Sequence, residues 1–98
     1  IMAVAGIWQM WNGSEKLITC AIVTVQSNQS MSHLHHRMPL ILDSSDWGKW
    51  LGEHGHGAAT LMRPTVDGQQ SFYKVSEDVN SNRTSGAYLI EEKRDLFG

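Results

Sequence analysis

A histidine and an arginine that lie two residues apart are the part of this sequence best suited to chemistry. His35 and Arg37 stand in the segment 35–39, which begins eleven residues after Thr24. An imidazole titrates near neutral pH and can move protons, whereas a guanidinium stays charged and binds phosphate through two hydrogen bonds. A proton-transferring group beside a phosphate-binding group indicates chemistry on a phosphorylated or nucleic-acid substrate.

The elements that must position these residues are strands of the first half of the chain. The apolar run 1–8 predicts a strand buried on both faces, and Asn12-Gly13 predicts a hairpin turn into a second apolar strand, 17–25. We expect residues 1–11 to pair with 17–25 and to dominate the core. A third short strand is predicted over 40–42, directly after the His-Arg segment.

Short helices are expected in the second half. Polar residues 43–46 are N-cap candidates for a helix through Trp47, Trp50 and Leu51, whose spacing places them on one apolar face. Four further features are expected in chain order: a short helix over 58–62 ended by Pro64, a strand over 72–75, a polar loop from Val79 and a charged tail over 91–95. The sequence therefore predicts an α+β fold, mostly antiparallel.

Composition restricts the class of protein. The chain of 98 residues is long enough for one domain at most, and its 41% hydrophobic content is not that of a disordered segment. A net charge of -2 argues against a general binder of polyanions, although it leaves room for a local basic site. No apolar run is long enough to span a membrane. A single cysteine excludes an internal disulfide, so a reducing, intracellular compartment is expected.

Metal binding is a weaker interpretation of the histidines. The five are His33, His35, His36, His54 and His56, and the last two lie in a glycine-rich loop without a cysteine partner. A zinc site needs three or four converging ligands, usually with cysteine or carboxylate help. We expect no metal and no cofactor. A metal-dependent hydrolase remains an alternative interpretation of the histidines, and bound zinc in elemental analysis would reveal it.

Two other residue types could carry function. Cys20 lies inside an apolar strand, where a thiol is expected to be buried and inert. The tryptophans could stack on bases, but helical spacing favours a core role for Trp47 and Trp50. Trp11, next to the predicted turn, is the one that stays open as a base-stacking candidate.

Six short motifs occur in order along nearly the whole chain. They are Ala5-Gly6-Ile7-Trp8, Ile22-Val23-Thr24, His35-His36-Arg37-Met38-Pro39-Leu40-Ile41-Leu42, Trp50-Leu51, Pro64 and Val75-Ser76-Glu77-Asp78-Val79-Asn80. Together they resemble the C-terminal half of the SOS response-associated peptidase (SRAP) family, and the His-x-Arg-Met-Pro element is the most specific of them. The resemblance covers residues 1–91 and leaves 92–98 as a charged C-terminal tail. It implies a mostly antiparallel, barrel-like sheet with short helices.

The resemblance also implies a function. Members of the family sense abasic sites in single-stranded DNA. An amino-terminal cysteine, freed by self-cleavage, attacks the ring-opened deoxyribose aldehyde, and the Schiff base closes to a thiazolidine. By this resemblance the whole protein is an enzyme of DNA repair, with peptidase and DNA–protein crosslinking activity. Its location would be the cytoplasm and nucleoid, or the nucleus in a eukaryote.

Three residues inherit roles through the resemblance. His35 corresponds to the acid–base histidine for ring opening and crosslink reversal, Thr24 to a DNA contact near the lesion, and Arg37 to support of the site or of the phosphate backbone. His36 falls at the variable position of the motif. Because alternate side chains of an extended segment point to opposite sides, we expect His36 to face away from His35.

Several residues of the family's site have no counterpart in this chain. They are the nucleophilic cysteine, an asparagine in an Asn-Ala-Arg-x-Glu segment and a glutamate in a Gly-Phe-Tyr-Glu-Trp segment. Cys20 is not expected to replace the nucleophile, and Gln9 does not correspond to the catalytic glutamate. We therefore expect a missing N-terminal half of the same domain as a partner, and a 98-residue chain that is inactive and unstable alone. The alternative is a non-catalytic single-stranded DNA-binding module that keeps Thr24 and Arg37.

Overall fold

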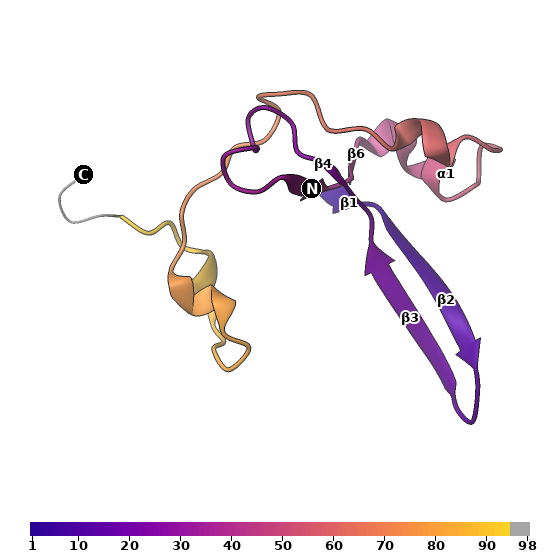
Figure 1. The fold of residues 1–98 in the computed structure, drawn as a ribbon, viewed down its shortest axis with the longest axis horizontal. Coiled ribbons are helices and arrows are strands. Elements are labelled where there is room, and N and C mark those ends of the chain that lie inside the picture. The colour runs from indigo at the N-terminus through magenta and orange to yellow at the C-terminus, as the bar shows by residue number, and fades with distance from the viewer. Residues whose placement is uncertain (95–98) are drawn as a thin grey trace.

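The computed structural model describes residues 1–94 and is an α+β fold in which every strand pair is antiparallel. The strands are β1 (Ala3–Val4), β2 (Gly6–Asn12), β3 (Lys16–Ile22), β4 (Thr24–Gln26), β5 (Arg37–Pro39) and β6 (Ile41–Leu42) (Figure 1). They form three two-stranded ladders, β1–β6, β2–β3 and β4–β5. The predicted class and strand direction are confirmed, and the ladders of residues 1–94 do not close into a barrel.

The three ladders meet at three residues that lie between strands. The Ala5 N–H donates to the Leu40 carbonyl at 2.8 Å, the Leu40 N–H to the Val23 carbonyl at 2.9 Å, and the Val23 N–H to the Ala5 carbonyl at 3.0 Å. Ala5 and Leu40 are each 1% exposed, so these backbone groups need partners within the protein. This junction explains why the expected strands 1–8 and 17–25 are each interrupted, at Ala5 and at Val23, where the chain changes its pairing partner.

The core around this junction is small. In the described part of the chain six apolar residues are buried, and four partly buried ones pack against them: Ala5, Val25, Met38, Leu40, Leu42 and Leu61, with Val23, Met31, Ile41 and Trp50. The molecule measures 52 × 38 × 23 Å and has a radius of gyration of 17.2 Å. A compact domain of this length has a radius of gyration of about 13 Å. The chain is therefore extended, with separate parts around a limited core (Figure 1).

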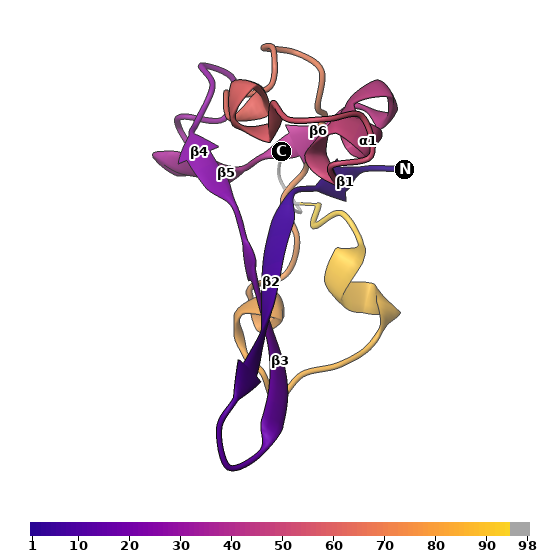
Figure 2. The same ribbon diagram turned by 90° about the vertical axis from the view of Figure 1, so that its right-hand side faces the viewer.

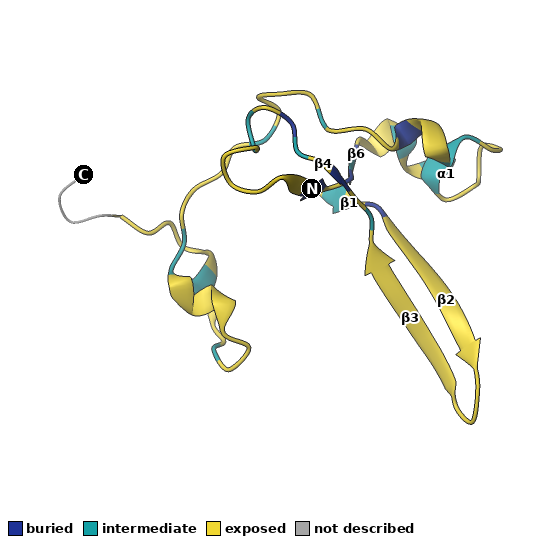
Figure 3. Cartoon of the chain, in the orientation of Figure 1, coloured by how far each residue is buried: buried dark blue, intermediate teal, exposed yellow. Residues whose placement is uncertain are grey.

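The β2–β3 hairpin pairs as predicted but is not buried. Its register places Trp8 opposite Cys20 and Met10 opposite Ile18, and every residue of both strands is exposed (Figure 3). The prediction that the first strand lies at the centre of the core is therefore wrong, as is the prediction of a buried Cys20. Burial on both faces requires elements that cover both faces, and residues 1–94 provide none along the hairpin, which projects from the junction (Figure 2).

The helix α1 (Trp47–Trp50) is attached to the strands by its two tryptophans. The Trp47 indole N–H donates to the Leu42 carbonyl and the Trp50 indole N–H to the Gly6 carbonyl, each at 3.1 Å. Trp50 packs against the core, whereas Trp47 stays 37% exposed. The predicted apolar face is therefore confirmed only in part: Trp50 packs against the core, whereas Leu51, like Trp47, remains exposed.

Short 3-10 helices make up the other regular structure of the described chain. They span Ser44–Asp46, Ala58–Leu61, Glu77–Asn80 and Ala87–Ile90. The second confirms the helix expected over 58–62, and the last two were not expected. The strand predicted over 72–75 is wrong: Lys74 accepts one backbone hydrogen bond, from Lys93, and no neighbouring strand pairs with the segment. The tail residues 92–94 are exposed, whereas Asp95 and 96–98 lie outside the described residues. Among residues 1–94, no helix has the length and apolar character required to cross a membrane.

Candidate functional site

The β4–β5 ladder places Thr24 and Arg37 on one exposed face. Val25 pairs with Met38 in its middle, and both are buried. Side chains alternate along a strand, so Thr24, Gln26 and Arg37 must lie on the opposite, solvent-facing side. A shift of one residue in the register would bury Arg37 and expose Met38, so the core fixes the position of the guanidinium.

The Arg37 guanidinium is held against Thr24. Its Nη2 donates to the Thr24 carbonyl at 2.7 Å and to Thr24 Oγ1 at 3.1 Å, and its Nε lies 3.3 Å from the same Oγ1. Within the described chain, Thr24 is the only hydrogen-bond partner of this side chain, and no carboxylate neutralises it. A permanently charged, exposed guanidinium with one nitrogen still unbonded is suited to a phosphate oxygen.

His35 lies beside this pair and is held by the backbone of Arg37. The Arg37 N–H donates to His35 Nδ1 at 2.9 Å, and the same Nδ1 lies 3.2 Å from the Arg37 carbonyl. Because the backbone N–H always carries its hydrogen, Nδ1 accepts in the neutral ring and the proton resides on Nε2. When the ring is protonated, Nδ1–H can donate to the carbonyl instead. His35 therefore keeps a backbone partner for Nδ1 in both protonation states, which leaves Nε2 free for proton transfer.

His36 does not face away from His35, contrary to the sequence prediction. The two imidazoles are stacked, with centroids 4.4 Å apart and planes inclined by 19°. Alternation of side chains holds only within a strand, and β5 begins at Arg37, so both histidines precede it in irregular backbone.

Ser27 and Asn28 fix the loop that carries the histidines, and sequence reasoning missed both. The Ser27 hydroxyl donates to the His35 carbonyl, and the Ser27 N–H donates to the His36 carbonyl at 3.0 Å. Asn28 is 8% exposed, and its side-chain amide donates to the Thr65 carbonyl at 2.9 Å. An asparagine in a polar segment gives no sign in the sequence that it will be buried; only its partner 37 residues later explains it.

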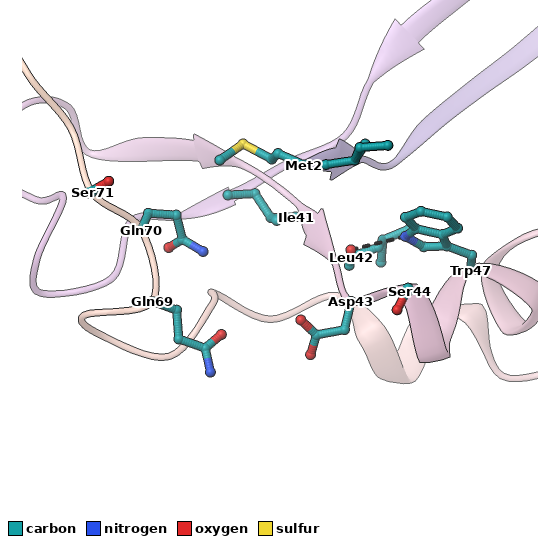
Figure 4. Close-up of a pocket in the computed structure, with 10 residues that line it drawn as sticks. Met2, Ile41, Leu42, Asp43, Ser44, Trp47, Gln69, Gln70 and Ser71 are labelled. Atoms are coloured by element: carbon teal, nitrogen blue, oxygen red, sulfur yellow. Dashed lines mark hydrogen bonds between the residues drawn. The ribbon is translucent and has the colours of Figure 1, made fainter.

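The other candidate residues lie elsewhere. Trp11 stands near the tip of the exposed hairpin and Cys20 on its flank, away from His35. His54 and His56 lie in the exposed loop after α1, and the chain up to residue 94 contains no group of three potential metal ligands. A hollow of about 810 Å³ lies along β6 and the loop 69–71, with Met2, Ile41 and Trp47 in its wall (Figure 4). None of Thr24, His35 and Arg37 lines it.

Comparison with known proteins supports the family resemblance independently of the site geometry. A family model described as SOS response associated peptidase (SRAP) matches residues 1–82. Abasic site processing protein YoqW of Bacillus subtilis is 33% identical over 96 residues, which cover 93% of this chain and 43% of that protein. Abasic site processing protein HMCES of Gallus gallus is 36% identical over 90 residues, 85% of this chain and 26% of that protein.

A solved structure shares the fold. The crystal structure of a protein from Bacteroides thetaiotaomicron has a TM-score of 0.79 and 25% sequence identity, over 93% of this chain and 43% of that one. This chain therefore spans less than half the length of each of these relatives. Because the family model covers most of the sequence, the chain belongs to the SOS response associated peptidase (SRAP) family.

Proposed function

We propose that this chain supplies part of the site of an abasic-site processing domain. The complete domain would crosslink to single-stranded DNA through a thiazolidine formed by an amino-terminal cysteine outside these residues, and would free that cysteine by its own peptidase activity. One observation carries the proposal: the exposed Arg37 guanidinium, fixed by Thr24, stands next to an imidazole that has a partner in both protonation states.

His35 would act on the deoxyribose of the lesion. An abasic sugar is a cyclic hemiacetal, and it opens when the C1′ hydroxyl loses a proton while the ring oxygen gains one. The protonated His35 ring would donate its Nε2 proton to the ring oxygen while Nδ1–H stays on the Arg37 carbonyl, and the freed Nε2 would accept the proton of the C1′ hydroxyl, so the net charge does not change. The amine of the cysteine then adds to the aldehyde, water leaves, and the thiol adds to the C=N bond to close the ring.

Thr24 and Arg37 would hold the DNA. Arg37 presents a positive charge to a phosphate, and the Thr24 hydroxyl fixes the guanidinium while remaining exposed near the bound strand. A net charge of -2 fits such a local contact better than an extended electrostatic surface. The working location would be that of the DNA, the nucleoid or, in a eukaryote, the nucleus.

The partner of this chain would be the remaining, N-terminal part of the same domain. The curated relatives are more than twice as long, and the exposed apolar hairpin offers a surface for further elements. The alternative function, a DNA-binding module without chemistry, is favoured by one observation: Cys20, the single cysteine, lies on the hairpin and not beside His35.

A crosslinking assay separates the two functions. The N-terminal part of Bacillus subtilis YoqW would be joined to residues 1–98 to give a completed domain, which is incubated with a labelled single strand that contains one abasic site. We expect a denaturant-resistant protein–DNA band that is absent with the intact strand. Cys20→Ser is the control and should leave the band unchanged. Binding of both strands without a resistant band would establish the module and exclude the enzyme.

Substitution Arg37→Gln is expected to weaken binding of single-stranded DNA regardless of sequence. Loss of one phosphate contact should reduce the slope of log K against log salt by about 1. Fluorescence anisotropy at several salt concentrations measures both quantities in the completed domain. Arg83→Gln, which removes an exposed arginine outside the β4–β5 ladder, serves as the control. An equal loss of slope in both variants would contradict a specific phosphate contact at Arg37.

A further inference from the structure

The stacked pair of imidazoles has a feature that the acid–base role of His35 alone does not require. His36 places its ring against that of His35, with centroids 4.4 Å apart and nearly parallel planes. Both side chains are exposed, so packing within the core does not enforce the stack. An exposed histidine would otherwise sample several rotamers, and the loss of that freedom has to be offset by contacts.

The backbone beneath the rings is fixed in a way that aligns them. Ser27 binds the carbonyls of both histidines, one through its hydroxyl and one through its N–H. Arg37 then binds the Nδ1 edge of His35 through its own N–H. Arg37 thus holds the Nδ1 edge of the His35 ring, and the ring of His36 lies against the face of the same ring.

We propose that His36 is a positioning residue for His35. Its ring holds the His35 imidazole flat, so that Nδ1 stays at the Arg37 backbone and Nε2 is the nitrogen left for substrate, which carries the proton of the neutral ring when no DNA is bound. The inference rests on the proposed function only for its effect on rate, because the orientation and tautomer of His35 are properties of the protein without DNA. It replaces the expectation, based on an extended segment, that His36 faces away from His35.

The expected effect is moderate. Aromatic pairs in proteins contribute a free energy equivalent to about twofold to tenfold in an equilibrium. His36→Ala should therefore lower the rate of crosslink reversal about twofold to tenfold. Affinity for an intact single strand should not change, because His36 supplies no phosphate contact. His36→Phe keeps a planar ring without an ionisable group and should restore the rate.

Two measurements in the completed domain test this. Reversal rates and binding of intact DNA are compared for His36→Ala, His36→Phe and the control His33→Ala, whose ring lies against Phe72 instead. Separately, nitrogen-15 NMR of the DNA-free protein reads the His35 tautomer. We expect the Nε2–H form in the parent, the control and His36→Phe, and a mixture of tautomers in His36→Ala.

The outcomes are distinguishable. An unchanged His35 tautomer in His36→Ala would overturn the proposal, whatever the rates are. A rate in His36→Phe as low as in His36→Ala would also overturn it, since the ring alone would then not suffice. If the parent does not process abasic DNA at all, the proposed function fails, and the NMR comparison still decides whether His36 positions His35.

Discussion

His35→Ala is expected to slow ring opening and crosslink reversal by about 10²–10⁴-fold, the usual contribution of a general acid–base group. The structure gives the reason for the size of the effect. The imidazole accepts from the Arg37 N–H when neutral and can donate to the Arg37 carbonyl when protonated, so its Nδ1 edge keeps a backbone partner in both states. Alanine removes the imidazole, and with it both the proton acceptor and the proton donor.

Crosslink formation should survive in part. The amino-terminal cysteine carries the nucleophilic attack, and the sugar opens slowly without help, so the mutant should reach the same end point later. Time courses of crosslinking and of reversal on abasic single-stranded DNA measure the two steps separately. His54→Ala, a change at an exposed histidine in another loop, is the matched control. A defect in His36→Ala larger than that in His35→Ala would contradict the assignment of the acid–base role.

The local structure of this chain could be predicted from its sequence, whereas its burial could not. Asn12-Gly13 and the apolar runs on both sides predict the hairpin, and the pairing of Trp8 with Cys20 follows. The same apolar residues also predict that both faces of the hairpin are buried. That prediction fails within residues 1–94, because burial requires other elements that cover the hairpin. A strand such as 72–75 fails for a related reason, because β propensity becomes a strand only where a neighbouring strand can pair.

The candidate site shows the same division. Residue types and the His-x-Arg-Met-Pro motif single out His35 and Arg37, and the structure places Thr24 in contact with Arg37 across one ladder. The stack of His36 on His35 could not be predicted, because it depends on backbone that leaves the extended conformation just before β5. The hydrogen bonds from Ser27 to the carbonyls of His35 and His36 could not be predicted either, because they form only when the loop between them closes.

The 98 residues alone are expected to lack a cooperative unfolding transition. Among residues 1–94 the core holds six buried apolar residues, whereas large apolar side chains such as Trp8, Ile18 and Ile22 are each more than 60% exposed. Native domains are stable by only a few kcal/mol, and burial of apolar surface supplies the main favourable contribution. A chain that leaves this much apolar surface in water cannot offset the conformational entropy lost on folding.

The completed domain should behave differently for a specific physical reason. The hairpin has apolar residues on both faces, Trp8 and Ile18 on one and Trp11 and Leu17 on the other, since cross-strand partners share a face. One covering layer would leave the second face exposed, so the hairpin has to be enclosed from both sides. Backbone amides of 6–12 and 16–22 should then change from fast to slow hydrogen exchange.

Circular dichroism during heating, binding of the dye ANS and hydrogen exchange measure these properties in the isolated chain and in the completed domain. We expect a gradual change, strong dye binding and unprotected hairpin amides in the first, and a sharp transition with protected amides in the second. A sharp transition of the isolated monomer, without dye binding, would show that the small core around Ala5, Val23 and Leu40 is sufficient. The hairpin would then be a surface of a folded protein and not the interior of a larger one.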